Sequence, residues 1–462
     1  MKRISIILAI VLCGIIFCGA LAWGGEYFYG KFFATKDDLM NSFKKAGINW
    51  KQFEGETITF LGNSEPNQES IMKLVPIFEE LTGIKVTHEL VNEENLRQKI
   101  TIDLTGKTGV YDAMLLDPGY ISLYVKSDSL DDLGLYLNDA ALTDQKWYQW
   151  PSDFPENFIK IGQVKDVQYG LPLHLSGTLM IYRKDIYQEK GIPGPAKTFD
   201  ELMDYASKLN QPDDYYGIAM RGMAGAGLNM FIWTTFLKSF GGKWWDENWK
   251  PTLDSPESIS SVKFYSDILK KYGPPGVSSW EWSKILSGLQ TGKVTTAIDT
   301  PAFAISIENP ELSKSAGKWG YAPQPAGKAG ITMDPYSWYV GINKDSQHKK
   351  AAWLFMTWMT SKEVQMAIGG PTIYVSRLSV NSDPRWQEDY PWLESWQTAL
   401  MENVKYADPD CRPRIPEYPE IGNIVGAVLE EVISGQKEAE VAMKEVNQKV
   451  YEVLDKAGYY KK

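Results

Sequence analysis

Cysteine and histidine are scarce in this chain of 462 residues, which contains three of each. Cys13 and Cys18 lie in an apolar N-terminal segment, so only Cys411 remains in the rest of the chain. A lone cysteine cannot form an internal disulfide, and three widely separated histidines provide no cluster of zinc ligands. We therefore expect a protein that is held together by its hydrophobic core, with no metal and no other cofactor.

Positive charge is in deficit as well, because 48 Lys and Arg face 58 Asp and Glu, which gives a formal net charge of −10. Binding to nucleic acid requires clustered basic residues that neutralise phosphates, so this composition argues against a nucleic-acid partner. An anionic membrane surface is disfavoured for the same reason. With 44% hydrophobic residues, the composition is otherwise that of a globular protein.

Catalytic signatures are also missing, since the chain contains no Walker loop, no Gly-x-Ser-x-Gly elbow and no His-Glu-x-x-His motif. The glycine-rich stretch 222–227 has the wrong spacing for a dinucleotide-binding fingerprint and is best interpreted as a pliable loop. Glu430 and Glu431 lie in a helical stretch and are most simply a solvated face. Among 58 acidic residues, such pairs do not by themselves indicate a glycosidase.

One long apolar run stands at the N-terminus. Lys2 and Arg3 precede the uncharged residues 4–23, and Ala20-Leu21-Ala22 has the small-x-small pattern of a signal peptidase site. About 19 apolar residues can also span a bilayer, so residues 1–22 are expected to be a signal peptide or, alternatively, an uncleaved anchor. In both cases we expect the body of the protein to lie outside the cytoplasm and to contact the membrane only through this segment.

Strand-like and helix-like segments alternate further along the chain. A β-prone run at 58–61, helical spacing from 71 to 81, a strand-like run at 84–87, helical spacing from 96 to 104 and an apolar strand at 111–116 follow one another. This order predicts a mostly parallel sheet flanked by helices, and such sheets bind ligands beyond the carboxyl ends of their strands. The loops after Leu61 and Leu116 are therefore candidate binding loops.

Tryptophans are frequent in segments that we expect to be loops, namely Trp147, Trp150, Trp244, Trp245, Trp249, Trp280, Trp282 and Trp338. Flat apolar rings combined with Asn, Asp and Arg suit a polyhydroxylated ligand, because a sugar offers both apolar C–H faces and hydroxyl groups. Packing is the simpler explanation for any single ring, but we expect at least one of the set to lie in a site.

An ordered set of short motifs resembles the family 1 extracellular solute-binding proteins of ABC importers. The set comprises 75–86, Tyr111-Asp112, 169–172, 181–185, 197–202, 217–222, Gly241-Gly242, 252–257, Gly292-Lys293, 351–355 and 412–418. The resemblance covers about residues 56 to 455. Arg221-Gly222, the Gly-Gly pair before Lys243-Trp244 and residues 377–380 are most similar to the branch that binds sugars and sugar alcohols.

This resemblance implies an α/β, two-lobed, periplasmic-binding-protein-like fold of the class II type, with the ligand cleft between the lobes. The implied division is a spacer at 23–55, a first lobe from 56–172 and 323–365, and a second lobe from 173–322 and, mainly, 366–462 with its C-terminal helices. The implied function is that of a monomeric extracellular receptor that delivers a sugar or sugar alcohol to an ABC permease and catalyses nothing. A secreted carbohydrate-active hydrolase and a receptor for a non-sugar solute are the alternatives.

The resemblance also implies ligand-binding positions, which are Asn63, Asp117, Tyr120, His174, Ser176, Arg221, Asn229, Trp233, Trp280, Asp299, Trp338 and Arg377. Simpler explanations exist for several of them: Asp117 can open a turn, and Trp233 lies in an apolar run where packing is an equal alternative. We expect Trp338 to reach the cleft and stack on a sugar without being needed in the core of its lobe.

Overall fold

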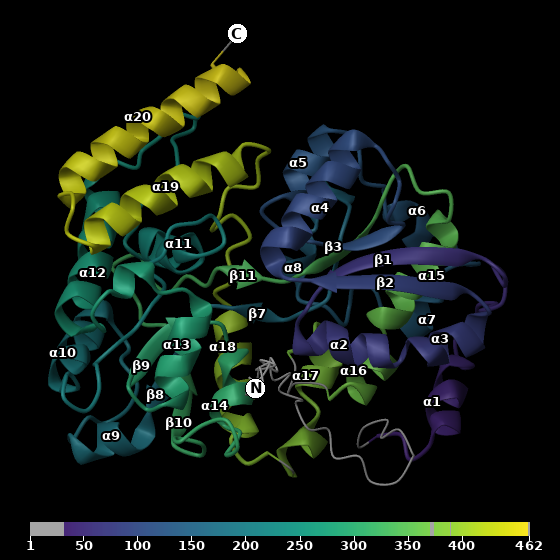
Figure 1. Ribbon diagram of the computed structural model, residues 1–462, viewed down its shortest axis with the longest axis horizontal. Coiled ribbons are helices and arrows are strands. Elements are labelled where there is room, and N and C mark those ends of the chain that lie inside the picture. Colours follow the sequence, from purple (N-terminus) through teal and green to yellow (C-terminus); the bar gives the residue numbers. More distant parts are fainter. Residues whose placement is uncertain (1–31, 370–373, 389, 461–462) are drawn as a thin grey trace, which may run out of the picture.

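The computed structural model describes residues 32–369, 374–388 and 390–460, which form two α/β lobes side by side (Figure 1). This arrangement confirms the expected two-lobed fold. The expected signal peptide or anchor at 1–22 lies outside the described residues. Within the described ranges, no helix combines the length and the apolar character that a bilayer span requires.

The first lobe is built on a five-stranded sheet in the order β2-β1-β3-β12-β6. Its strands are β1 (Thr57–Asn63), β2 (Lys85–Val91), β3 (Ala113–Leu116), β6 (Leu171–Pro172) and β12 (Tyr339–Ile342). The strands β2, β1 and β3 are parallel, as predicted, whereas β12 runs antiparallel to both β3 and β6. Helices α4 and α5 lie on one side of the sheet and α2 and α3 on the other (Figure 1).

The helices from residue 36 to 161 are α1 (Lys36–Phe43), α2 (Pro66–Lys73), α3 (Val75–Thr82), α4 (Glu93–Gly106), α5 (Ile121–Lys126), α6 (Gly134–Leu137), α7 (Gln145–Tyr148) and α8 (Glu156–Ile161). Leu39 and Phe43 of α1 are fully buried in the core of the first lobe, together with Trp50. The described part of the expected spacer is thus packed on this lobe, because its apolar side chains recur at helical spacing.

The second lobe contains an antiparallel sheet in the order β10-β8-β9, formed by β8 (Leu179–Arg183), β9 (Thr296–Asp299) and β10 (Trp319–Ala322). Its antiparallel pairing differs from the mostly parallel sheet that the strand-helix alternation predicted. Around it lie α9 (Lys184–Glu189), α10 (Phe199–Lys208), α11 (Asn229–Ser239), α12 (Pro256–Tyr272), η1 (Val277–Ser279), α13 (Trp282–Gln290) and α14 (Phe303–Ile307).

The remaining helices are α15 (Lys349–Met359) and α16 (Lys362–Ala367), then α17 (Leu378–Asn381), η3 (Pro384–Glu388), α18 (Leu393–Val404), α19 (Tyr418–Ile433) and α20 (Ala439–Ala457). Helix α15 packs in the core of the first lobe, and α19 and α20 pack in the core of the second lobe. A short hairpin of the first lobe consists of β4 (Gln163–Val164) and β5 (Val167–Gln168).

Two crossing segments run side by side between the lobes, where β7 (Ser176–Gly177) pairs antiparallel with β11 (Pro335–Tyr336) (Figure 1). Tyr336 lies opposite Ser176 in this pair. The pairing brings the chain that enters the second lobe against the chain that returns from it. We keep the lobe boundaries expected from the sequence as our proposal.

Candidate ligand-binding site

Oppositely charged side chains meet where the loops and helices after β1, β2 and β3 reach the second lobe. Arg97 of α4 donates from Nε and Nη2 to Asp117 Oδ2, at 3.0 and 2.8 Å, and from Nη2 to Glu93 Oε2 at 3.0 Å. Asp117, in the loop after β3, is only 5% exposed. The single guanidinium of Arg97 therefore pairs with both carboxylates of this first-lobe cluster, which has one more acidic than basic group.

The second lobe contributes a matching ion pair. Arg221 donates from Nε to Asp299 Oδ2 at 3.0 Å and from Nη2 to Asp299 Oδ1 at 2.6 Å, and Asp299 is fully buried at the end of β9. Burial would lower the pKa of Arg221, but the charge of Asp299 and, from the first lobe, that of Glu93 raise it. The two charged clusters thus face each other across the lobe boundary.

Gly227 of the second lobe lies against the guanidinium groups of both lobes. Its carbonyl accepts from Arg221 Nη1 at 3.2 Å, and a Cβ at this position would lie 3.2 Å from Arg97 Nη2. A larger residue here would push against the guanidinium group of the other lobe. The absence of a side chain at Gly227 lets the lobes close around the site.

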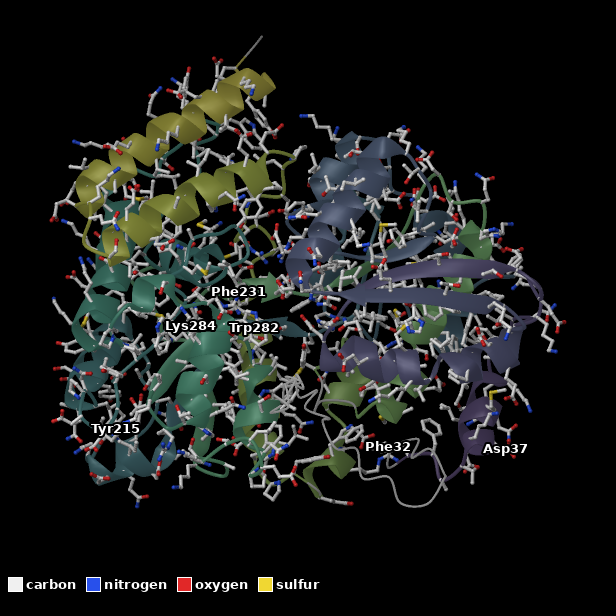
Figure 2. The ribbon with its side chains drawn as sticks, in the orientation of Figure 1. Phe32, Asp37, Tyr215, Phe231, Trp282 and Lys284 are labelled. Carbon is white, nitrogen blue, oxygen red and sulfur yellow. The ribbon has the colours of Figure 1, made fainter. Side chains whose placement is uncertain are left out.

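An aromatic wall runs along the same boundary. Phe231, which lies there in Figure 2, makes an edge contact with Tyr336 at 5.7 Å between ring centroids. Tyr336 in turn makes an edge contact with Trp338 at 5.9 Å. The Arg221 guanidinium lies 5.0 Å from the Phe231 ring and that of Arg97 lies 5.6 Å from the Trp338 ring. Apolar ring faces and charged edges therefore line one site.

Glu65 is the acidic group of this site that lacks a basic partner among the described residues. Its Oε2 accepts from the hydroxyl of Tyr374 at 2.9 Å and its Oε1 accepts from Trp338 Nε1 at 3.2 Å. Removal from water and the nearby charge of Glu93 raise the pKa of Glu65 to about 7. The carboxyl group is consequently near its titration midpoint at neutral pH.

We expect the stability of the protein to depend on pH through Glu65. Because its pKa is raised on folding, the stabilising contribution of the neutral carboxyl is complete below about pH 4.5 and is lost as the pH rises through about 7. Relative to Glu65→Gln, the wild-type free energy of unfolding should fall by roughly 2 to 3 kcal/mol over this range. Urea unfolding of both proteins from pH 4 to 8 measures the difference, and parallel curves would contradict it.

Two buried amide oxygens near this group, Asn63 Oδ1 and Gln68 Oε1, have no hydrogen-bond partner among the described residues. Both side chains are at most 1% exposed. Gln68 Nε2 lies 3.1 Å from Nε2 of His174, whose pKa burial lowers to about 3, so that its ring is neutral. Buried acceptors without donors are costly, and they suit a ligand that brings hydroxyl groups.

The structure brings several of the predicted residues together. Asn63, Asp117, Arg221, Asp299 and Trp338 surround the lobe boundary as described above. Tyr120 follows Asp117, and its pKa is raised by burial and by that carboxylate. His174 makes an edge contact with the ring of Tyr374 at 4.7 Å, and the Ser176 hydroxyl lies 3.1 Å from that of Thr300, beside Asp299.

Four predicted residues lie elsewhere. Trp233 is fully buried and donates to Ser261 Oγ at 3.1 Å, because every face of α11 is covered by the core of the second lobe. Asn229 donates to the carbonyls of Gly222 and Gly426 and so anchors the loop 222–227 on α19. Trp280 lines a separate surface hollow with Lys284. Arg377 is fully buried and donates to backbone carbonyls. Packing therefore explains Trp233 and Arg377 better than ligand binding, whereas ligand binding by Asn229 and Trp280 stays a prediction.

The residues that sequence reasoning missed are Glu65, Gln68, Glu93, Arg97, Phe231, Tyr336 and Tyr374. Glu93 and Arg97 lie in the first turns of the helix that follows β2. The expectation that ligands bind beyond the carboxyl ends of strands was applied only to the loops after Leu61 and Leu116, and applying it to β2 as well would have found both residues. Tyr374 had no local signal, because it reaches Glu65 from 309 residues away. Among the residues that the structure describes, no cluster of three His, Cys, Asp or Glu side chains could hold a metal ion.

Trp338 differs from expectation in one respect. Trp338 is 1% exposed and belongs to the core of the first lobe. The prediction that this ring is not needed in the core of its lobe is therefore wrong. Its indole N–H nevertheless points to Glu65 at the site. The same ring therefore serves both packing and the site.

We expect Trp338→Phe to weaken ligand binding by about 1 kcal/mol, or roughly fivefold, because the phenyl ring keeps a stacking face but loses the donor to Glu65. The larger truncation Trp338→Ala would add a core cavity and cost stability as well. Isothermal titration with the expected ligand, a sugar alcohol, measures the affinity, and urea unfolding measures the stability. An unchanged affinity in a destabilised Trp338→Phe protein would assign the ring to packing alone.

Comparison with known families and structures gives a consistent result. The family described as bacterial extracellular solute-binding protein matches residues 62–366. A mannitol-binding protein of Pseudomonas aeruginosa is 29% identical over 424 residues, which cover 88% of this chain and 95% of that protein. An erythritol/L-threitol-binding protein of Mycolicibacterium smegmatis is 27% identical over 338 residues, 69% of each chain.

Solved structures of similar proteins include two solute-binding proteins of ABC transporters. The protein from Agrobacterium radiobacter in complex with ribitol has a TM-score of 0.77 and 27% identity, and that from Agrobacterium vitis with bound D-mannitol has a TM-score of 0.76 and 29% identity. In both comparisons the match covers 87% of this chain and 99% of the other.

Proposed function

This chain belongs to the bacterial extracellular solute-binding proteins, and from that premise we propose that it captures a sugar alcohol or a small sugar between its lobes and delivers it to an ABC permease. The observation that supports this ligand class is the internal pairing of charge at the lobe boundary. Arg97 pairs with both Asp117 and Glu93, and Arg221 pairs with Asp299. What these groups still offer a ligand is hydrogen bonding.

A neutral ligand with many hydroxyl groups fits this arrangement better than a charged one. The carboxylate of an amino acid would need an unpaired cation in the site, and both guanidinium groups are already paired with carboxylates. Glu65, the acid without a basic partner among the described residues, has its pKa raised to about 7 and is partly neutral. The rings of Trp338, Tyr336 and Phe231 supply apolar faces for C–H groups. The relatives that bind mannitol, erythritol and ribitol support the same class.

The finer parts of the proposal concern mechanism and location. Because ligand groups come from both lobes, binding favours the closed arrangement of the lobes. We propose a monomeric receptor without catalytic activity whose body lies outside the cytoplasm, exported or anchored by residues 1–22. The binding proteins in its family support this over a hydrolase.

A thermal-shift panel tests the ligand class directly. Mannitol, ribitol, erythritol, glucose, maltose, a dipeptide and putrescine are each added at increasing concentration to the purified protein. A ligand at 100 times its dissociation constant stabilises by about 2.7 kcal/mol, so we expect at least one polyol to raise the melting temperature by several degrees. A shift with putrescine or the dipeptide alone would overturn the ligand class, and release of reducing ends from maltose would promote the hydrolase.

A further inference from the structure

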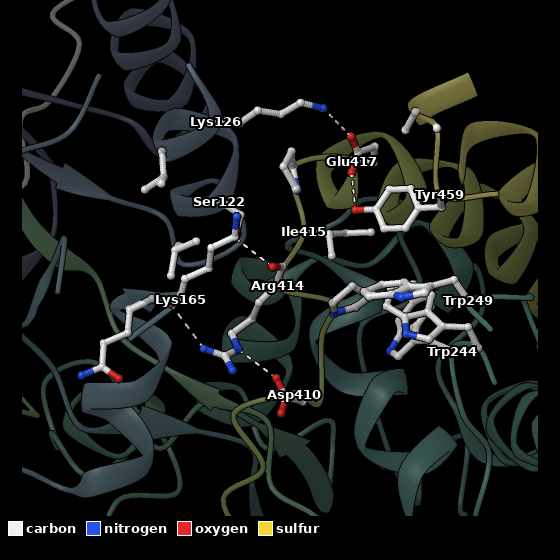
Figure 3. A pocket seen from close by; sticks show the side chains of 18 of the residues that line it. Ser122, Lys126, Lys165, Trp244, Trp249, Asp410, Arg414, Ile415, Glu417 and Tyr459 are labelled. Carbon is white, nitrogen blue, oxygen red and sulfur yellow. Dashed lines mark hydrogen bonds and ion pairs between the residues drawn. The ribbon is translucent and has the colours of Figure 1, made fainter. Parts of the chain in front are cut away.

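A second hollow, of about 1040 Å³, lies between the lobes and shares no lining residue with the site described above. Figure 3 shows it from close by. One wall comes from the first lobe, from α5 and the β4–β5 hairpin; the other comes from residues 243–249 and the end of α20. The segment 410–417 forms its floor and is tied to the first lobe by a hydrogen bond from Ser122 to the carbonyl of Arg414, 2.9 Å long.

Aromatic rings that are tilted against one another form the second-lobe wall of this interlobe groove. The ring of Trp249 lies 4.9 Å from that of Trp245 and 4.8 Å from that of Tyr459, and Trp249 is 36% exposed. Its backbone has a φ of +63°, which is rare for a bulky residue and costs free energy. The hydroxyl of Tyr460 donates to the Trp249 carbonyl at 2.9 Å and helps to hold this conformation.

The charges of the groove are positive in excess. Lys126 pairs with Glu417 at 2.8 Å, and Arg414 pairs with Asp410 at 2.8 Å (Figure 3). Lys165 lines the first-lobe wall and Lys243 the second-lobe wall. Within the described part of the chain, the ammonium groups of these two residues form no ion pair and no hydrogen bond. In a chain of net charge −10, two uncommitted cations that stand on opposite walls attract an anion between them.

We propose that this interlobe groove is a second binding site, for a short anionic saccharide. Its sugar rings would stack on Trp249, and its carboxylates would reach Lys165 and Lys243. The volume is at the upper end of the roughly 300–1,000 Å³ of small-molecule sites and accommodates more than one sugar ring. Because the two walls belong to different lobes, such a ligand binds one arrangement of the lobes better than another.

Trigalacturonate, which has three sugar rings and three carboxylates, is a suitable probe. It is titrated calorimetrically into the full chain in the presence of saturating mannitol, with maltotriose as the neutral probe of equal length. We expect one trigalacturonate per chain and no response to maltotriose. Trp249→Ala and Lys243→Gln should each raise the dissociation constant of trigalacturonate at least tenfold. Lys270→Gln is the control, because Lys270 is an exposed residue of α12 that does not line the groove, and it should leave this constant unchanged.

Several results would overturn the proposal. The first is that trigalacturonate does not bind, and the second is that it binds but neither Trp249→Ala nor Lys243→Gln weakens the binding. The third is an equal response to acetate, which would show that the groove attracts anions non-specifically. An affinity that responds to Asp117→Asn instead would place the probe in the first site. The titration is repeated without mannitol, so that a failure of the proposed polyol function would leave this test intact.

Discussion

Replacing Arg377 by alanine is expected to lower the free energy of unfolding by about 3 to 5 kcal/mol, the cost of breaking a buried ion pair from one side. The affinity for a sugar alcohol should stay the same. Arg377 is fully buried, donates from Nε to the Thr360 carbonyl at 2.8 Å, and lies 3.4 Å from Asp153 Oδ2. Its guanidinium also packs 4.3 Å from the ring of Phe154.

Denaturant unfolding measures the stability and calorimetric titration the affinity. Arg385→Ala is the matched control, because Arg385 is exposed and bound to Asp383 on the surface; its unfolding free energy should change by no more than about 0.5 kcal/mol. A tenfold loss of affinity in Arg377→Ala, at an unchanged unfolding midpoint, would return Arg377 to the ligand site.

Asp117→Asn should weaken binding of the sugar alcohol by roughly a hundredfold or more, which corresponds to about 2.7 kcal/mol. The amide is nearly isosteric but removes the charge that Arg97 faces at 2.8 Å, which leaves that partly buried guanidinium opposite Glu93 alone. Truncating one partner of a buried charge pair in a binding site typically costs 2 to 5 kcal/mol or more. Calorimetric titration at fixed pH measures the change.

Asp112→Asn provides the control for this substitution. Asp112 is also a buried acid of the first lobe, but its oxygens accept from the Thr59 amide at 2.8 Å and from the Ser346 hydroxyl at 2.5 Å, away from the lobe boundary. We expect this variant to lose stability and to bind normally. Equal losses of affinity in both variants would show that Asp117 acts only through the fold of the lobe.

Local patterns in the sequence determined several elements of both lobes. The strand expected at 58–61 lies within β1, and that expected at 84–87 overlaps the start of β2. Gly83 ends α3 in the left-handed conformation, and Thr198 accepts from the Glu201 amide at the start of α10. These features depend on backbone periodicity and on capping within a few residues. The same local logic directed attention to the loops that contain Asn63 and Asp117.

Only the tertiary structure decided which side chains meet at the site and which are packing groups. The α11 run that contains Trp233 is apolar on every side, so its sequence could not say which face would be buried, and the packed lobe buried all of them. Arg97 finds Asp117 from 20 residues away and Tyr374 finds Glu65 from 309. Such contacts depend on how whole helices and strands pack against one another. A buried charge is costly unless it is paired, and the partners available to it are the groups that the folded lobes bring close.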